Sequence, residues 1–170
     1  MTPEEALERA GVTLPEINKP VANYVMAVRT GSLLFLSGHG AFDGGTPVHT
    51  GRLGADLGTE DGRLAAEAVM LNLLATVRAE LGSLSAVARV VKMVVFVSST
   101  PGFTEQHLVA NGATDLLVRT FGNTVGRPAR SAVGVAALPL GGQDRLADHD
   151  TVAPAGLGVD GERDHRGSRA

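Results

Sequence analysis

Residues 88–99, "ARVVKMVVFVSS", form the stretch that decides the fold. Apolar and β-branched residues occupy both alternating positions, which predicts a central β-strand covered on both faces. A helix is predicted directly before it, because Thr59-Glu60-Asp61 places acids in a first turn and Gly82 can end the helix. Its apolar stripe recurs at helical spacing and consists of Met70, Leu73, Leu74, Val77 and Leu81.

A second helix and strand follow the central strand. Residues 104–121 predict a helix whose inward positions are Val109, Ala113, Leu116 and Leu117. Residues 126–140, "GRPARSAVGVAALPL", predict another strand with Arg130 near its start. The residues that share a face with Arg130 are all small, which allows another element to approach closely; they are Ala132, Gly134 and Ala136.

The N-terminal part predicts a short helix and a β-hairpin. Thr2, Pro3 and Glu5 form a helix start with a capping box, and Gly11 can end the helix. "PVANYVMAV" (20–28) and "LLFLSG" (33–38) flank the turn-forming "RTGS", so they predict the two strands of the hairpin. The glycine-rich residues 41–58 predict a loop with a short strand near Val48. The predicted class is α+β.

Composition and charge exclude several classes of function. The 170 residues suggest one domain, and the lack of cysteine excludes disulfides and thiolate chemistry. A net charge of −3 without a basic stripe argues against nucleic acid as a main partner. The polar start and the lack of a long apolar run predict a cytoplasmic protein with no membrane partner. The five histidines lack metal-ligand spacing, so no metal site is expected.

The last thirty residues differ from the rest. Residues 141–170 are rich in Gly, Asp and Arg and show no period, which predicts a disordered tail that adds no strand. The folded domain is therefore predicted to span residues 1–140. The abrupt change of pattern after Leu140 resembles a shifted reading frame.

Four segments carry a resemblance to a known family: "KPVANYVMAVRTGSLLFLSGHG", "TGRLGADL", "VVKMVVFVSSTPGFTEQHLVANGATDLLVRTFG" and "ARSAVGVAALPL". Residues 10–140 resemble the RidA/YjgF family, also called endoribonuclease L-PSP, and most closely its chorismate-mutase-like branch. The resemblance implies a mixed sheet with two helices on one face, and a barrel-like homotrimer with a site in each interface cleft. The implied activity is hydrolysis of 2-imino or enamine acids to 2-keto acids and ammonia, without a cofactor.

The resemblance also assigns roles to residues. Arg130 matches the family arginine that pairs with the substrate carboxylate, and a guanidinium suits this role because it binds carboxylate through two donors. The structural alternative is an ordinary ion pair with Asp or Glu. Tyr24 matches a tyrosine that lines the cleft, or is a strand residue with its hydroxyl in water. Ser37 and Gly38 match a motif that holds water or the imine nitrogen, or Ser37 caps backbone.

Two further polar residues are candidates. The resemblance places Asn111 near the cleft, and the Asn111-Gly112 pair is unfavourable inside a helix unless something compensates. The alternative is a helix that bends there or starts later. His39 could act as an acid or base near neutral pH. No carboxylate accompanies it in sequence, so a structural role is the favoured interpretation.

The chain departs from the family after Leu140. The family ends with a strand that carries two glutamates, and one of them is thought to activate water. Here no glutamate occurs between Leu140 and Glu162, so the last strand and the general base are predicted to be missing. Activity could then be impaired, and a non-catalytic protein that binds small carboxylic acids is the alternative. A chorismate-mutase-like enzyme would need several cations around a dicarboxylate, and a ribonuclease is disfavoured by charge.

Overall fold

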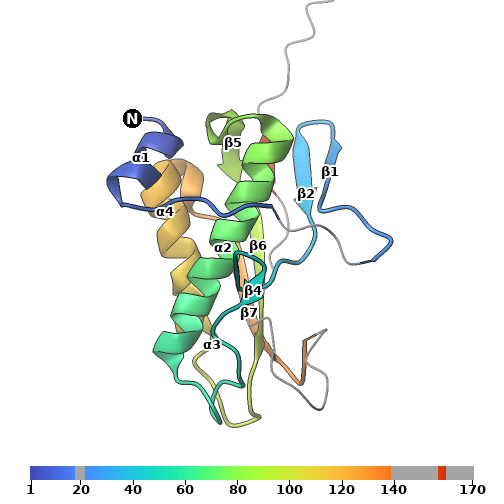
Figure 1. Cartoon of the computed structure of the whole chain (residues 1–170), viewed down its shortest axis with the longest axis vertical. Helices are drawn as coiled ribbons and strands as arrows, with labels where there is room; N and C mark the ends of the chain where they lie inside the picture. The colour runs from blue at the N-terminus through green and yellow to red at the C-terminus, as the bar shows by residue number, and fades with distance from the viewer. Residues whose placement is uncertain (18–21, 139–156, 160–170) are drawn as a thin grey trace, which may run out of the picture.

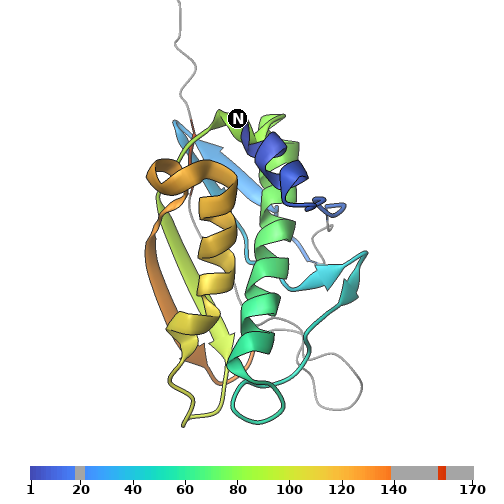
Figure 2. The same ribbon diagram turned by 90° about the vertical axis from the view of Figure 1, so that its left-hand side faces the viewer.

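The computed structural model describes residues 1–17, 22–138 and, for the backbone, 157–159. Two long helices, α2 (Thr59–Leu81) and α4 (Asn111–Gly126), lie side by side over one face of the strands (Figures 1 and 2). Helix α2 begins and ends as predicted, and Gly82 closes it in the left-handed conformation with φ of 80°. This arrangement confirms the α+β class with two helices on one face.

The strands run in mixed directions. β1 (Ala27–Thr30) and β2 (Leu33–Leu36) form the hairpin, and their sheet continues through β8 (Leu157–Val159) to β5 (Val87–Val90), all antiparallel. β6 (Lys92–Ser98) pairs in parallel with β7 (Ala129–Val135), with helices between them in the chain. β3 (Phe42–Asp43) and β4 (Thr46–Pro47) form a small hairpin, and β4 corresponds to the short strand predicted near Val48.

Several predicted elements have different bounds, among them the strand predicted over 126–140, which is β7 (Ala129–Val135). The hairpin's first strand begins at Ala27, because its register with β2 ends at the Ala27–Leu36 pair; residues 18–21 lie outside the described residues. The central strand divides into β5 and β6 around Val91. The second helix is interrupted, since α3 (Gln106–Val109) precedes α4, which ends five residues later than predicted. Asn111-Gly112 thus opens a helix instead of interrupting one.

The prediction that the last strand is missing and that the tail adds no strand is wrong for Leu157–Val159. This segment lies between β2 and β5, in register with Leu33 and Leu34 on one side and with Val87 and Val90 on the other. Without it, both neighbours would present unpaired backbone donors and acceptors, which favours pairing with a short extended segment. The remaining tail residues, 141–156 and 160–170, lie outside the described residues.

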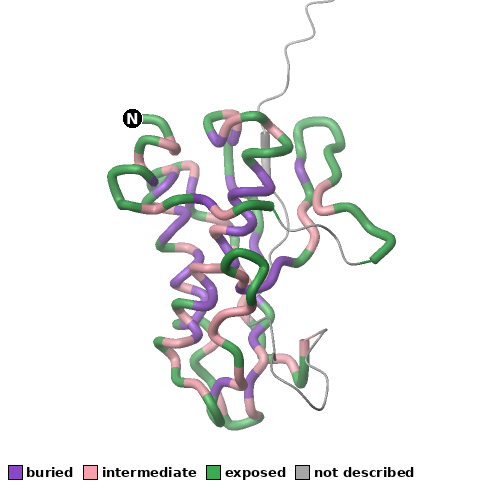
Figure 3. The backbone as a smooth tube through the Cα atoms, viewed as in Figure 1, coloured by how far each residue is buried: buried purple, intermediate pink, exposed green. Residues whose placement is uncertain are grey.

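The core lies between the helices and the sheet (Figure 3). Alternate residues of β6 are buried against the helices, and four of the five predicted stripe residues of α2 are buried with them. Leu81 is half-buried. The buried residues from the two helices and β6 include Met70, Leu73, Leu74, Val77, Met93, Val95, Val97, Leu116 and Leu117.

The opposite face of the strands is apolar and uncovered by the described residues. Val28 is paired with Phe35, and Phe96 with Val133; these four side chains are 37% to 53% exposed. The described residues of one chain cover the central strand on its helix-facing side, and they leave Phe96 on the other side 37% exposed. Large apolar side chains exposed in this way on two pairs of strands favour burial in an interaction surface.

Glu4 joins the N-terminal helix α1 (Pro3–Arg9) to the short 3₁₀ helix η1 (Leu84–Ala86). Its carboxylate accepts hydrogen bonds from the Ser83 hydroxyl at 2.8 Å, the Leu84 backbone N–H at 2.6 Å and the Ser85 hydroxyl at 3.4 Å. Burial would raise the pKa of Glu4, but these hydrogen bonds outweigh it and lower the pKa.

Glu4→Gln should therefore destabilise the fold by about 1–2 kcal/mol at pH 7, since charged hydrogen bonds are lost. A carboxyl group whose pKa is lowered in the folded state stabilises the fold at pH values above its unfolded pKa. This stabilisation is lost as the pH falls through the folded-state pKa. Urea unfolding at pH 7 and pH 3 should show the difference between wild type and Glu4→Gln shrinking at pH 3. Exposed Glu8→Gln is the control; a Glu4 effect no larger than that of Glu8 would contradict the assignment.

Candidate functional site

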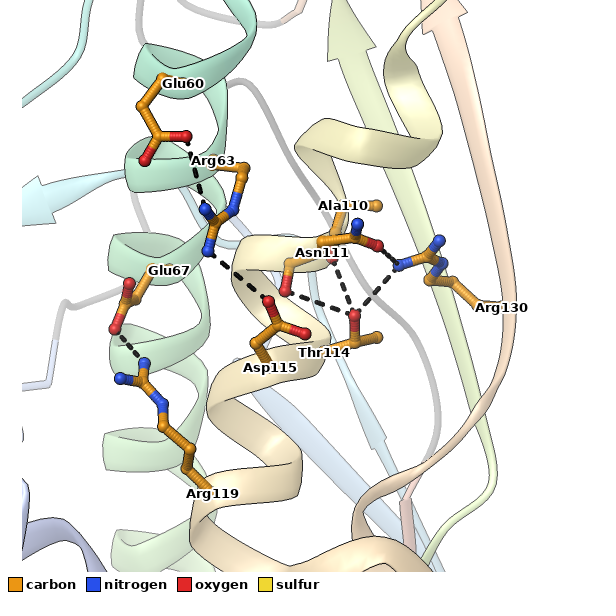
Figure 4. A network of polar contacts seen from close by, with 9 residues as sticks. All are labelled: Glu60, Arg63, Glu67, Ala110, Asn111, Thr114, Asp115, Arg119 and Arg130. Atoms are coloured by element: carbon orange, nitrogen blue, oxygen red, sulfur yellow. Dashed lines mark hydrogen bonds and ion pairs between the residues drawn. The ribbon is translucent and has the colours of Figure 1, made fainter.

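Arg130 stands near the start of β7, directly opposite Met93 of β6, and its half-buried side chain points toward α4 (Figure 4). Nη1 donates hydrogen bonds to Oδ1 of Asn111 at 2.9 Å and to Oγ1 of Thr114 at 3.0 Å. Nη2 donates to the backbone carbonyl of His107 at 3.1 Å. The guanidinium is thus held by the end of α3 and the first turn of α4.

The strand pattern explains this orientation. The register of β6 and β7 places Arg130, Ala132 and Gly134 opposite buried residues of β6, on the helix-facing side. A Cβ on Gly134 would lie 2.8 Å from Oγ of Ser99 and 2.9 Å from Nε2 of Gln106. The predicted close approach is confirmed for Gly134, because its small size admits the α3 side chain.

No described carboxylate lies within ion-pair distance of Arg130. The ordinary ion pair considered as the alternative is therefore not formed within the described part of the chain. A guanidinium has five N–H donors, and neutral acceptors take three of them here. Nε and one hydrogen of Nη2 are without a described acceptor, and they can lie along one edge of the guanidinium. That edge fits the two oxygens of a carboxylate.

Arg130 lines a groove of about 500 Å³ between α4 and the approach to β7. Its sole described carboxylate belongs to Asp115, which pairs with Arg63 of α2 at 3.5 Å. Arg119 pairs with Glu67 (Figure 4). The lining residues are Thr114, Asp115, Val118, Arg119, Arg127, Pro128 and Arg130.

The remaining candidate residues have different surroundings. Asn111 joins Arg130, as expected from its predicted place near the site. Tyr24 lies in a bend before β1 and is 43% exposed. Ser37 follows β2, and its hydroxyl donates to the Val25 carbonyl at 2.6 Å, which matches the backbone-capping alternative; Gly38 beside it is exposed. No described polar contact joins Tyr24, Ser37 or Gly38 to Arg130.

His39 is a structural histidine in this chain. Its ring is 5% exposed, with Nδ1 2.9 Å from the Ser37 carbonyl and Nε2 2.8 Å from the Thr76 hydroxyl. A carbonyl only accepts, so Nδ1 carries the hydrogen that it shares with Ser37. Burial lowers the pKa of His39, while the bond to Ser37 offsets part of this effect. Both ring nitrogens are engaged, which supports the structural interpretation.

Sequence reasoning missed three features of the site: Thr114, the His107 carbonyl and Arg127. Thr114 lies three residues after Asn111, and this spacing on a helix places both side chains on one face. Arg127 stands in "GRPAR", one residue before Pro128, within the segment that was predicted to form a strand. The backbone carbonyl has no signal in the sequence, because its position depends on how α3 ends.

The described residues contain no group of three or more His, Cys, Asp or Glu side chains able to hold a metal ion. Within the same residues, no helix combines the length and apolar character needed to cross a membrane.

Comparison with known proteins agrees with this geometry. The family model Endoribonuclease L-PSP matches residues 15–143. Protein TCP17 of Trypanosoma cruzi is 48% identical over 135 residues, covering 79% of this chain and 84% of TCP17. Atu1372 of Agrobacterium tumefaciens, whose crystal structure is described as having unknown function, has a TM-score of 0.81 and 39% identity, with 94% of each chain covered. The crystal structure of E. coli TdcF with bound serine has a TM-score of 0.53 and 25% identity, covering 85% of this chain and 93% of TdcF. The chain therefore belongs to the endoribonuclease L-PSP family, also known as RidA/YjgF.

Proposed function

We propose that this protein hydrolyses 2-imino or enamine acids to 2-keto acids and ammonia, with Arg130 holding the substrate carboxylate. The observation that carries the proposal is the guanidinium itself. Neutral groups fix it on one side, it has no described acidic partner, and the Nε–Nη2 edge keeps two donors. The match of TdcF with bound serine adds support, because serine is a small carboxylic acid that carries nitrogen on C2.

The reaction needs positioning more than it needs a cofactor. Water adds to the imine carbon and forms a carbon–oxygen bond; the carbon–nitrogen bond then breaks, and protons from the water leave with the nitrogen as ammonia. Arg130 would fix the carboxylate next to this carbon and offset its negative charge. Holding the acceptor carbon in one orientation lowers the entropic part of the barrier.

The groove offers few groups that could accept a proton from the attacking water. Asp115 is the only described carboxylate in the groove, and it is already paired with Arg63. This observation favours a second candidate function, a protein that binds small carboxylic acids without turning them over. The two candidates share Arg130 and differ only in turnover.

An imine-hydrolysis assay separates them. An enzyme that dehydrates threonine supplies 2-iminobutyrate, and formation of 2-ketobutyrate is followed with and without this protein. Wild type should accelerate hydrolysis, and Arg130→Ala should return the rate to that of the buffer. Binding of 2-ketobutyrate by calorimetry without acceleration would favour the binding protein. Acceleration that survives in Arg130→Ala would refute the proposed role of Arg130.

The proposed assembly is a homotrimer. The exposed apolar side chains of Val28, Phe35, Phe96 and Val133 favour burial in a subunit interface, and the family resemblance implies three subunits. β1 and β7 are each paired on one side only among the described strands, so a neighbouring subunit can meet these edges. An adjacent subunit could then bring Tyr24 and Ser37 toward the groove of Arg130.

Light scattering should give a mass near three times the 17.5 kDa of one chain. Phe96→Glu should dissociate the trimer, since a charge would be buried in the subunit interface. Leu64→Glu is the matched control, because Leu64 is a similarly exposed apolar residue on helix α2, and this variant should stay trimeric. A wild-type monomer at micromolar concentration would refute the assembly.

A further inference from the structure

The groove that contains Arg130 carries two positive charges without described acidic partners. Arg119 is paired with Glu67, and Asp115 is paired with Arg63, so these four side chains balance one another. Arg127 and Arg130 also line the groove, and neither has a described carboxylate within ion-pair distance. The groove therefore has more positive charge than a single carboxylate would offset.

The backbone that carries Arg127 is held in place. Its carbonyl accepts a hydrogen bond from Nη2 of Arg89 at 3.3 Å, and Nη1 of Arg89 bonds to the carbonyl of Thr124. Pro128 restricts the backbone on the other side. Arg89 thus closes the C-terminal end of α4 and directs the chain into β7. The Arg127 side chain itself has no described hydrogen-bond acceptor, although its backbone is anchored at the wall of the groove.

We propose that the groove selects small acids with two carboxylates, one held by Arg130 and the other by Arg127. This inference rests on the proposed function, because it assumes that Arg130 holds the carboxylate next to the reacting carbon. The preferred substrates would be the 2-imino forms of acidic amino acids, and the corresponding 2-keto diacids would be the products. Val118 and Pro128, which also line the groove, provide apolar surface for the carbon chain between the two acidic groups.

Calorimetric titration at one fixed salt concentration tests the proposal with three acids. 2-Ketobutyrate has one carboxylate, 2-ketoglutarate has two, and phosphoenolpyruvate has one carboxylate and a phosphate on its C2 oxygen. Wild type should bind 2-ketoglutarate about tenfold more tightly than 2-ketobutyrate, the usual worth of one added charged pair. Arg127→Gln should remove this preference, because it weakens binding of 2-ketoglutarate far more than binding of 2-ketobutyrate. Arg9→Gln, an exposed arginine of α1 outside the groove, should leave both affinities unchanged.

The outcomes separate this inference from the proposed function. Equal affinity for the two keto acids in wild type, or an equal loss for both in Arg127→Gln, overturns the second carboxylate site while the role of Arg130 stands. Tighter binding of phosphoenolpyruvate than of 2-ketoglutarate overturns the dicarboxylate assignment in favour of a phosphate. Unchanged 2-ketobutyrate binding in Arg130→Gln refutes the proposed function itself.

Discussion

Arg130→Lys should weaken binding of 2-ketobutyrate by about 2–3 kcal/mol, or roughly 30- to 150-fold, although it keeps the positive charge. Lysine offers a point charge, whereas the guanidinium presents two parallel donors to a carboxylate. Lysine also cannot reproduce the three fixed bonds to Asn111, Thr114 and the His107 carbonyl, so the charge would no longer be held in place. Titration calorimetry of wild type and variant measures the loss.

The same substitution at Arg119 is the control. Arg119 lines the groove but is paired with Glu67, so Arg119→Lys should change the affinity less than twofold. Asn111→Ala should have an intermediate effect, since it removes one of the groups that position Arg130 without removing the guanidinium. Equal losses in Arg130→Lys and Arg119→Lys would contradict a specific role for the Arg130 guanidinium, since both variants keep the positive charge.

Gly112→Ala should destabilise the fold by about 3 kcal/mol and lower Tm by roughly 6–12 °C. A Cβ on Gly112 would lie 2.0 Å from the backbone oxygen of Arg63, where α4 crosses α2. A backbone atom within a long helix cannot move away as a side-chain tip can. The gain of about 1 kcal/mol in helix propensity from glycine to alanine is smaller than the cost of separating the helices.

Gly102→Ala is the matched control, because nothing lies within 4 Å of its added Cβ. Its stability should stay within about 0.5 kcal/mol of wild type. Gly112→Ala should also weaken ligand binding, since Asn111 is the adjacent residue and holds Arg130. A thermal melt of Gly112→Ala that coincided with those of wild type and Gly102→Ala would contradict the close helix contact.

Local pattern was sufficient for most of the fold. Helix α2 was predicted from its acidic start and its glycine end, and the hairpin from two apolar runs around a turn. The position of β8 could not be predicted, because "LGV" within a glycine-rich tail has no period. Its pairing depends on the gap between β2 and β5, which exists only once the rest of the sheet has formed.

The site was predictable where it depends on a motif and unpredictable where it depends on packing. Arg130 and Asn111 were both identified from the sequence, and they are hydrogen-bonded to each other. The compensation required for Asn111-Gly112 is also explained, since Gly112 allows α4 to contact α2. The groove around Arg127 depends on where α4 ends and on the Arg89 contact, and neither has a local sequence signal.

A crystal structure of the full chain with 2-ketobutyrate would test the central claim, that Arg130 holds the substrate carboxylate. The account predicts both carboxylate oxygens about 3 Å from Nε and Nη2 of Arg130, the usual length of such charged hydrogen bonds. Nη1 should keep its bonds to Asn111 and Thr114. A carboxylate bound elsewhere, with Arg130 still joined only to its present partners, would contradict the account.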